Sequence, residues 1–257
     1  MWSFIRPVVF VAMVAAMAAL AYDHFKTVFV APYSAGADGQ EMIFLRDRPA
    51  SQFARGPEEP ELDYVQRMSN LVYSATGHCL PSDSRLSTIE RLLLLPIPEL
   101  KWQGILTIER FECGFCHQRS HILSTILGQN GTESFVLGLN GHVVVQFAIG
   151  DSTYVADPDY GIAPFRYDLQ REALRAEAMA VYAAIGSSND ELIANMYATS
   201  EDNGPYISPT ILYILEAYQR IAFWLATAAA TLCVVGSLVL SGLAFKHTRR
   251  VSWSKKT

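Results

Sequence analysis

The fold is decided by the stretch CGFCHQRSHILSTILGQNGTESFVLGLNGHVVVQFAIGDSTYVADPDYGI, which occupies residues 113–162. Apolar residues recur at helical spacing in its first third: Ile122, Leu123, Ile126 and Leu127. This spacing predicts a helix over 117–128, and the sequence GQNG that follows is typical of a helix end. Cys116 therefore stands at the start of the predicted helix.

The second part of the stretch is rich in β-branched and aromatic residues. Runs at 134–139, 142–149 and 152–157 predict three strands, and the Gly150-Asp151 pair predicts a tight turn between the last two. A helix followed by a short antiparallel sheet predicts an α+β fold.

The register of the predicted hairpin decides which side chains meet on the sheet. With the turn at Gly150-Asp151, His142 lies opposite residue 159, and Asp157 is its diagonal neighbour on the same face. A shift of one residue would separate the two side chains. The sequence thus predicts an imidazole beside a carboxylate, with the thiol of Cys116 at a helix N-terminus. A helix dipole and a nearby imidazolium both lower the pKa of a cysteine.

The sequence CGFCH at 113–117 has several interpretations. As C-x-x-C-H it is a haem attachment motif, and as C-x-x-C it is a redox pair of Cys113 and Cys116. Cys116 alone could be a nucleophile that needs a later histidine and carboxylate. The plainest interpretation is a structural disulfide or a buried thiol. His117 and His121 likewise suggest either a metal pair or ordinary helix residues.

Three separated motifs resemble the core of the transglutaminase-like superfamily. They are a cysteine that opens a helix, with a glycine about 15 residues later and then a strand, a histidine motif that reads HVVVQ here, and the sequence DPDYG. Cys116, Gly131, His142 and residues 157–161 stand at the matching positions, within about 50 of the 257 residues. The resemblance implies a papain-like α+β core in which a catalytic helix packs on a short antiparallel sheet. It also implies Cys116 as nucleophile, His142 as its base and Asp157 as the residue that orients His142.

The resemblance implies an enzyme that hydrolyses amides or esters, or transfers acyl groups, through a thioester and without a cofactor or metal. Its substrate would be a peptide, an ester or a glycan-linked acyl group, with cell-envelope proteins as partners. Gln146 and Cys113 depart from the family pattern, so an inactive interaction domain and a thiol-disulfide redox protein stay open as alternatives. Tyr160 and Phe165 lie near the motif and either line a substrate cleft or pack in the core.

The predicted domain contains three cysteines, Cys79, Cys113 and Cys116. If Cys116 is a free thiolate, Cys79 and Cys113 are the natural partners for a disulfide in an oxidising compartment. The alternatives are a Cys113–Cys116 bond, which would block the nucleophile, and three free thiols.

Charge and hydropathy are unevenly distributed along the chain. All 25 acidic residues lie within 23–219. The charged residues of 1–22 and 220–257 are all basic. The net charge of −5 gives no overall basic balance that would attract nucleic acid. Residues 221–245 are uncharged and long enough to span a membrane. Residues 7–22 form a shorter uncharged segment, either a membrane anchor or a signal peptide.

These patterns predict five segments. Residues 1–22 are a transmembrane anchor or signal peptide, 23–60 a loop-rich linker, 61–205 an exported transglutaminase-like domain, 209–245 a helix leading into a C-terminal span, and 246–257 a basic cytoplasmic tail. We therefore expect the chain in the cytoplasmic (inner) membrane, in contact with the lipid bilayer, with its domain on the extracytoplasmic, periplasmic side. Extra helices are predicted at 61–76, 86–95, 169–185 and 190–198.

Overall fold

The computed structural model of the chain describes residues 2–29, 43–78, 86–97, 106–199 and 203–254. These residues form seven α-helices and a five-stranded antiparallel sheet, which confirms the predicted α+β class. The chain divides into two compact units: residues 1–32, 85–98 and 220–257 form one, and residues 33–84 and 99–219 form the other. We describe each unit by itself.

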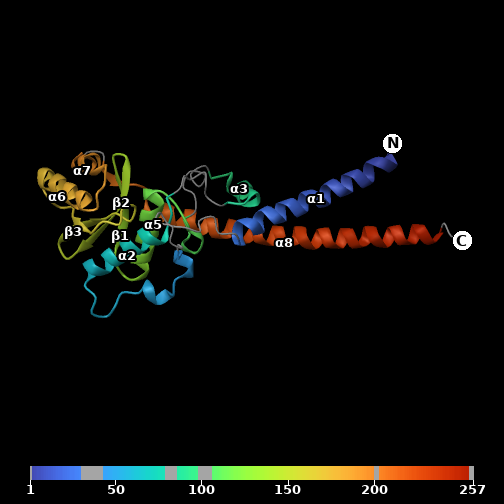
Figure 1. Cartoon of the computed structure of the whole chain (residues 1–257), viewed down its shortest axis with the longest axis horizontal. Helices are drawn as coiled ribbons and strands as arrows, with labels where there is room; N and C mark the ends of the chain where they lie inside the picture. The colour runs from blue at the N-terminus through green and yellow to red at the C-terminus, as the bar shows by residue number, and fades with distance from the viewer. Residues whose placement is uncertain (1, 30–42, 79–85, 98–105, 200–202, 255–257) are drawn as a thin grey trace. The chain divides into compact units, whose positions relative to one another are not determined.

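The first unit consists of helices. It contains α1 (Trp2–Phe29), the short α3 (Thr88–Leu94) and the C-terminal part of α8 (Pro209–Ser254), a helix that begins in the other unit (Figure 1). Apolar windows at Val9–Val28 and Thr210–Gly242 make α1 and α8 long and apolar enough to cross a membrane.

Two contacts define how α1 and α8 pack in this unit. His24 of α1 lies 3.0 Å from the hydroxyl of Thr227 in α8. A side-chain carbon added at Gly236 would lie 2.7 Å from the Met17 methyl carbon. Residue numbers fall along α1 as they rise along α8, so the two helices run antiparallel.

The second unit is built on a sheet with the strand order β4-β3-β2-β1-β5. The three longer strands are β1 (Ser134–Leu139), β2 (His142–Ile149) and β3 (Ser152–Ala156), within one residue of the predicted runs. The edge strands β4 (Phe165–Arg166) and β5 (Gly204–Pro205) were not predicted, because two residues carry no alternating pattern.

The register of the β2–β3 hairpin agrees with the prediction. Val145 pairs with Ala156, and Gly150 adopts a φ of +58° in the turn. When this ladder is continued beyond its last pair, His142 becomes the diagonal neighbour of Asp157.

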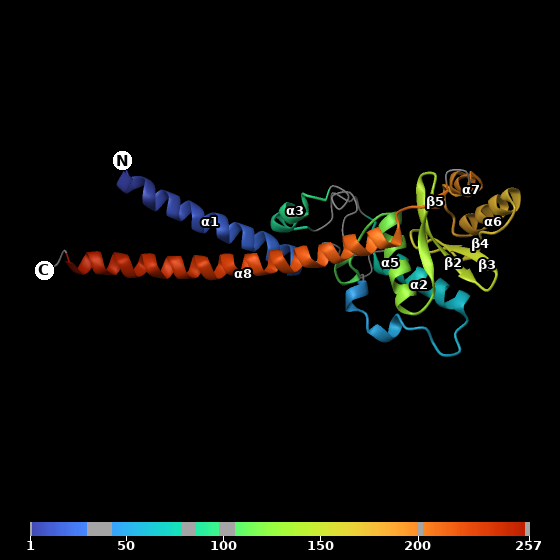
Figure 2. The same cartoon turned by 180° about the vertical axis from the view of Figure 1, so that it is seen from behind.

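Helices cover both faces of the sheet (Figures 1 and 2). α2 (Glu61–Ala75) and α5 (Cys116–Gln129) pack on one face, and α6 (Arg171–Ala184) and α7 (Asp190–Ala198) pack on the other. These helices correspond to the predicted ones. Three short 3-10 helices complete the described elements: η1 (Leu45–Asp47), η2 (Ala50–Gln52) and η4 (Ile108–Arg110).

Successive residues of β2 point to opposite faces of the sheet and contribute to both apolar cores. Val145 and Phe147 are buried against α2 and α5, whereas Val144 is buried against α6 and α7. His142 has the same parity as Val144, so its side chain belongs to the α6–α7 side of the sheet. It stands at the strand's first residue, where the sheet ends.

Candidate active site

Cys116 is the first residue of α5, and the residues before it fix its position. Phe115 is extended at the N-cap (φ −92°, ψ 178°), and its backbone N–H donates to Gln118 Oε1 at 3.1 Å. Gly114 is needed here, because a side-chain carbon would lie 2.7 Å from both the Phe111 ring and Gln118 Oε1. The half-buried thiol therefore lies at a helix end where the dipole favours negative charge.

The segment before α5 is held by a short parallel bridge to the residues that follow α2. The Gly77 N–H donates to the Glu112 carbonyl at 2.9 Å, and the Gly114 N–H donates to the Gly77 carbonyl at 3.1 Å. These two bonds fix the backbone directly before the thiol-bearing helix.

The cysteines near this bridge differ in state. Cys113 is disulfide-bonded, whereas Cys116 is a free thiol. The two are therefore not bonded to each other, and the Cys116 thiol is available for reaction. Cys79, the predicted partner of Cys113, lies outside the described residues.

His142 begins β2 and Asp157 follows β3, so the hairpin brings the two side chains together. His142 Nε2 lies 2.7 Å from Asp157 Oδ2, and both residues are buried, Asp157 completely. This is the imidazole–carboxylate pair that the register predicted. Because Nε2 is engaged by the carboxylate, Nδ1 is the ring nitrogen left to face the thiol.

The surroundings of this pair favour a charged imidazole. Burial lowers the pKa of His142, but the charge and hydrogen bond of Asp157, together with those of Cys116, outweigh burial and raise the pKa well above its usual range. Burial raises the pKa of Asp157, but the charge and hydrogen bond of His142 and the hydrogen bond of Tyr182 hold it below its usual value.

Asp157 accepts hydrogen bonds from three groups. Besides His142, the Tyr182 hydroxyl donates to Oδ2 at 2.5 Å and the Asp159 N–H donates to Oδ1 at 2.8 Å. Because the Tyr182 proton is directed to Asp157, the hydroxyl of Tyr197, 3.1 Å away, must donate to the Tyr182 oxygen. A chain of hydrogen bonds therefore runs from Tyr197 through Tyr182 and Asp157 to His142.

Tyr182 and Tyr197 were missed by sequence reasoning. They lie on α6 and α7 at positions that an amphipathic helix buries, and both side chains are fully buried. Burial, with the negative charge of Asp157, raises the pKa of both hydroxyls well above their usual range. No motif marks them, because only the packing of α6 and α7 brings them to the carboxylate.

A second ionic group joins α5 to the DPDYG segment. Arg119, one turn into α5, is buried, and its Nη1 lies 3.2 Å from Asp159 Oδ1 while its Nη2 donates to the Thr76 carbonyl at 2.7 Å. His78 Nδ1 lies 3.4 Å from the same carboxylate oxygen. Burial lowers the pKa of Arg119, and burial with the charge of Asp157 raises the pKa of Asp159. This group therefore fixes three chain segments around the thiol-bearing turn.

Aromatic rings border the imidazole and the thiol. Tyr160 is half-buried and packs edge-on against His142, with 5.7 Å between ring centroids, and Phe115 packs against His78 at 5.3 Å. Phe165 is buried in the core under α6 and α7. Of the two predicted substrate-binding residues, Tyr160 thus lies beside the imidazole, and Phe165 packs in the core.

His117 and His121 have separate surroundings. The His117 ring lies 5.8 Å from that of Tyr206, and His121 is buried with its Nε2 3.4 Å from Glu216 Oε2 in α8. Within the described ranges, no group of three or more His, Cys, Asp or Glu residues is arranged to hold a metal ion.

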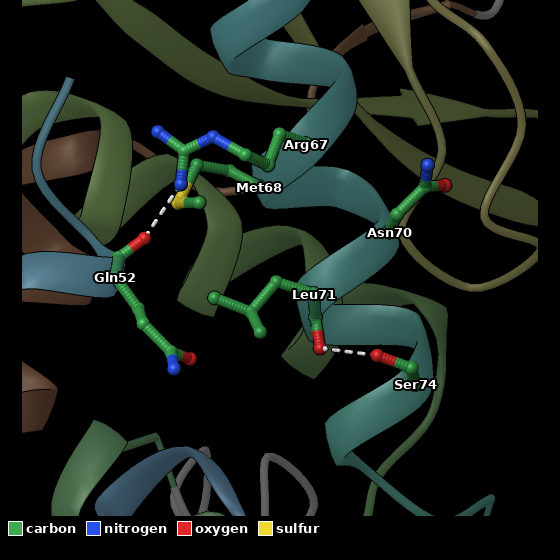
Figure 3. Close-up of a pocket in the computed structure, with 6 residues that line it drawn as sticks. All are labelled: Gln52, Arg67, Met68, Asn70, Leu71 and Ser74. Carbon is green, nitrogen blue, oxygen red and sulfur yellow. Dashed lines mark hydrogen bonds between the residues drawn. The ribbon is translucent and has the colours of Figure 1, made fainter. Parts of the chain in front are cut away.

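A pocket of about 290 Å³ lies along α2. Cys116, His142 and Asp157, here called the triad, are not among its lining residues, which are Gln52, Arg67, Met68, Asn70, Leu71 and Ser74 (Figure 3). Arg67 points to the Gln52 carbonyl and donates to it at 2.6 Å. Hydrogen bonds from Arg67 also lower the pKa of Glu59 to about 2. The cation of this pocket is therefore already paired within the protein.

Comparisons of the chain with protein-family models, with curated proteins and with solved structures find no match. The features of the chain that point to a function are the geometry of Cys116, His142 and Asp157 and the resemblance of the motifs that contain them.

Proposed function

We propose that the protein is a cysteine-dependent enzyme of the transglutaminase-like type, which hydrolyses amides or esters or transfers acyl groups. The observation that carries this proposal is the buried His142–Asp157 pair, 2.7 Å apart, beside the free thiol of Cys116 at a helix N-terminus. A papain-like core is supported by the packing of α5 on the antiparallel sheet.

In the proposed mechanism, the Cys116 thiolate attacks the carbonyl carbon of the substrate and forms a C–S bond. The His142 imidazolium gives a proton to the leaving amine or alcohol as the C–N or C–O bond breaks, which leaves a thioester on Cys116. Water or an amine then attacks the thioester, His142 takes its proton, and the thiolate is released. Asp157 holds the ring through Nε2 and stabilises its charge.

We further infer that α1 and α8 cross the cytoplasmic membrane and that the sheet-containing unit lies on the periplasmic side. The basic residues outside the apolar windows and the antiparallel packing of the two helices support two cytoplasmic termini. The hydrogen bond between His24 and Thr227 favours a retained anchor over a cleaved signal peptide. Substrates would then be peptides, esters or glycan-linked acyl groups of the cell envelope, and envelope proteins would be the partners.

The test is labelling of the full chain, in detergent at neutral pH, with a thiol-reactive acyl probe. We expect rapid labelling of Cys116, which Cys116→Ala abolishes. Cys233→Ala removes the other free cysteine among the described residues and serves as the matched control, because it leaves the triad intact. His142→Ala is expected to slow labelling by roughly two orders of magnitude or more, the usual contribution of a positioned base.

Two outcomes would contradict the proposal. Labelling that persists in Cys116→Ala would place the reactive group elsewhere. Labelling of Cys116 at an unchanged rate in His142→Ala would show an ordinary thiol, as expected of an inactive interaction domain.

A further inference from the structure

We propose that α3 and the residue after it, Leu95, form a third contact with the membrane. In this proposal α3 lies in the outer interface of the bilayer with its exposed leucines in lipid. The proposal rests on the proposed membrane location of α1 and α8. In the sequence, α3 lies between residues 33–84 and 99–219, the two segments of the sheet-containing unit.

α3 has a well-defined start and a short length. Ser87 Oγ accepts the Glu90 N–H at 3.4 Å, and Glu90 Oε2 accepts the Ser87 N–H at 3.0 Å, which together form a capping box. The seven residues of the helix rise only about 10 Å, against about 30 Å for a hydrocarbon core. Such a helix is too short to cross a bilayer but long enough to lie in its interface.

Hydrogen bonds attach the start of α3 to α1, and His24 of α1 is in turn bonded to α8. The Thr88 N–H donates to Asp23 Oδ2 at 2.7 Å, and Ser87 Oγ lies 2.9 Å from His24 Nδ1. The other ring nitrogen of His24 lies 3.0 Å from the Thr227 hydroxyl of α8. Asp23 and His24 belong to the last turns of the apolar window of α1, so α3 is joined to the end of that window, where a membrane interface would lie.

The charges of α3 fit this position. Glu90 is 1% exposed, accepts from the Ser87 hydroxyl at 2.9 Å, and lies 3.9 Å from His24. The acid is therefore turned inward and is not offered to lipid. Arg91, the other charged residue within 88–94, is exposed, and its Nε donates to the Leu86 carbonyl at 2.9 Å, so this charge is held at the start of the helix.

The exposed leucines of α3 and Leu95 define the surface that we propose contacts lipid. Leu94 is buried, whereas Leu92 is 59% exposed and Leu95 is 66% exposed. In the same unit, the exposed large apolar side chains of α8 include Leu238, at 68%. The leucines of α3 therefore continue the kind of surface that the two proposed spans present, and lipid is the partner that fits both.

The test places nitroxide spin labels on the full chain in lipid vesicles. Leu92→Cys and Leu95→Cys report on α3, and Leu238→Cys reports on the proposed span. Leu192→Cys on α7 is the matched control, because Leu192 is a helical leucine of similar exposure, 57%, in the sheet-containing unit. Each label is measured for collisions with oxygen, which partitions into lipid, and with a water-soluble nickel chelate.

The background for these variants replaces by serine the two cysteines that are free within the described part of the chain, Cys116 and Cys233. This background chain, without an added cysteine, is treated with the label to measure any reaction at the remaining cysteines. Circular dichroism of each labelled chain checks that its helix content is unchanged.

We expect the oxygen-to-nickel collision ratio at positions 92 and 95 to be several-fold higher than at 192 and close to that at 238. Ratios at 92 and 95 equal to that at 192, with 238 in lipid, would overturn the inference about α3 alone. Low collision rates with both reagents at 92 and 95 would show a protein-covered surface and would overturn it as well. A water-like ratio at 238 would overturn the membrane location of α8, and this inference with it.

Discussion

At the scale of single residues, Asp157 connects His142 to the buried tyrosine Tyr182. It is completely buried, and hydrogen bonds from an imidazole, a phenol and a backbone N–H engage both of its oxygens. A carboxylate in this setting can remain charged because each donor compensates for lost hydration. The charge of Asp157 in turn raises the pKa of His142, so the two residues titrate as a linked pair.

This linkage predicts a pH dependence of stability. The raised pKa of His142 gives a contribution that is complete below about pH 6.5 and is lost as the pH rises through the folded-state pKa. The lowered pKa of Asp157 gives a contribution that is present above about pH 3.9 and is lost as the pH falls. We expect Asp157→Asn to abolish the decline in the free energy of unfolding above about pH 6.5, measured by denaturant unfolding. The same decline in parent and variant would contradict this linkage.

Tyr182 supports a second prediction at this scale. Tyr182→Phe removes the phenol donor to Asp157 and leaves the buried Tyr197 hydroxyl without an acceptor. An unsatisfied buried polar group costs about 1–3 kcal/mol, so we expect the free energy of unfolding to fall by about that amount. Tyr213→Phe is the control, because Tyr213 is 73% exposed, and it should change stability by less than about 0.5 kcal/mol. Equal effects of the two substitutions would rule out the hydrogen-bond chain as a source of stability.

At the scale of elements, the start of α5 depends on the absence of a side chain at Gly114. Gly114→Ala would place a carbon 2.7 Å from the Phe111 ring, and overpacking of this kind costs about 1–3 kcal/mol. Gly128→Ala, in the same helix, meets nothing within 4 Å and should be neutral or stabilise by about 0.5–1 kcal/mol. Thermal unfolding of both variants measures this contrast. A Gly114→Ala chain as stable as the parent would refute the packing argument.

The disulfide at Cys113 also belongs to this scale. We expect peptide mapping without reductant to recover Cys113 linked to Cys79 and Cys116 as a free thiol. A bond between positions 79 and 113 would stabilise the domain by roughly 3–4 kcal/mol in the chain-entropy model. Recovery of a Cys113–Cys116 peptide would instead support the redox alternative.

The elements show what the sequence could and could not predict. The strands β1 to β3 and their register followed from local signals, because a short turn at Gly150 fixes which residues pair. The register could place His142 beside Asp157 and the apolar pattern could place Cys116 at a helix start, whereas their proposed roles came from the resemblance of the motifs. Tyr182 and Arg119 could not be chosen, since their roles arise from packing between segments distant in the chain. The strand β5 could not be predicted, because its two residues pair with β1 only once the chain between them has folded.

At the scale of the whole molecule, the arrangement of charge predicts the topology. The two apolar windows lie in α1 and α8. The charged residues of 1–22 and 220–257 are all basic, whereas every acidic residue lies within 23–219. We expect a cytoplasm-dependent reporter fused after Thr257 to be active and an export-dependent reporter inserted near Gly150 to be active. Exchanging the two reporters provides the control. Activity of the export-dependent reporter after Thr257 would contradict this topology.

The hydrogen-bond chain that ends at Tyr197 sets the shortest part of the chain that could keep the proposed site intact. The stretch that carries the triad ends near residue 162, but the donors that hold its carboxylate stand on α6 and α7. A fragment cut after the DPDYG motif would keep each reacting group and lose the scaffold that keeps Asp157 charged in a buried place. Residues 113–162 inserted into another protein would therefore lack the Tyr182 and Tyr197 hydroxyls that support Asp157, unless α6 and α7 were inserted with them.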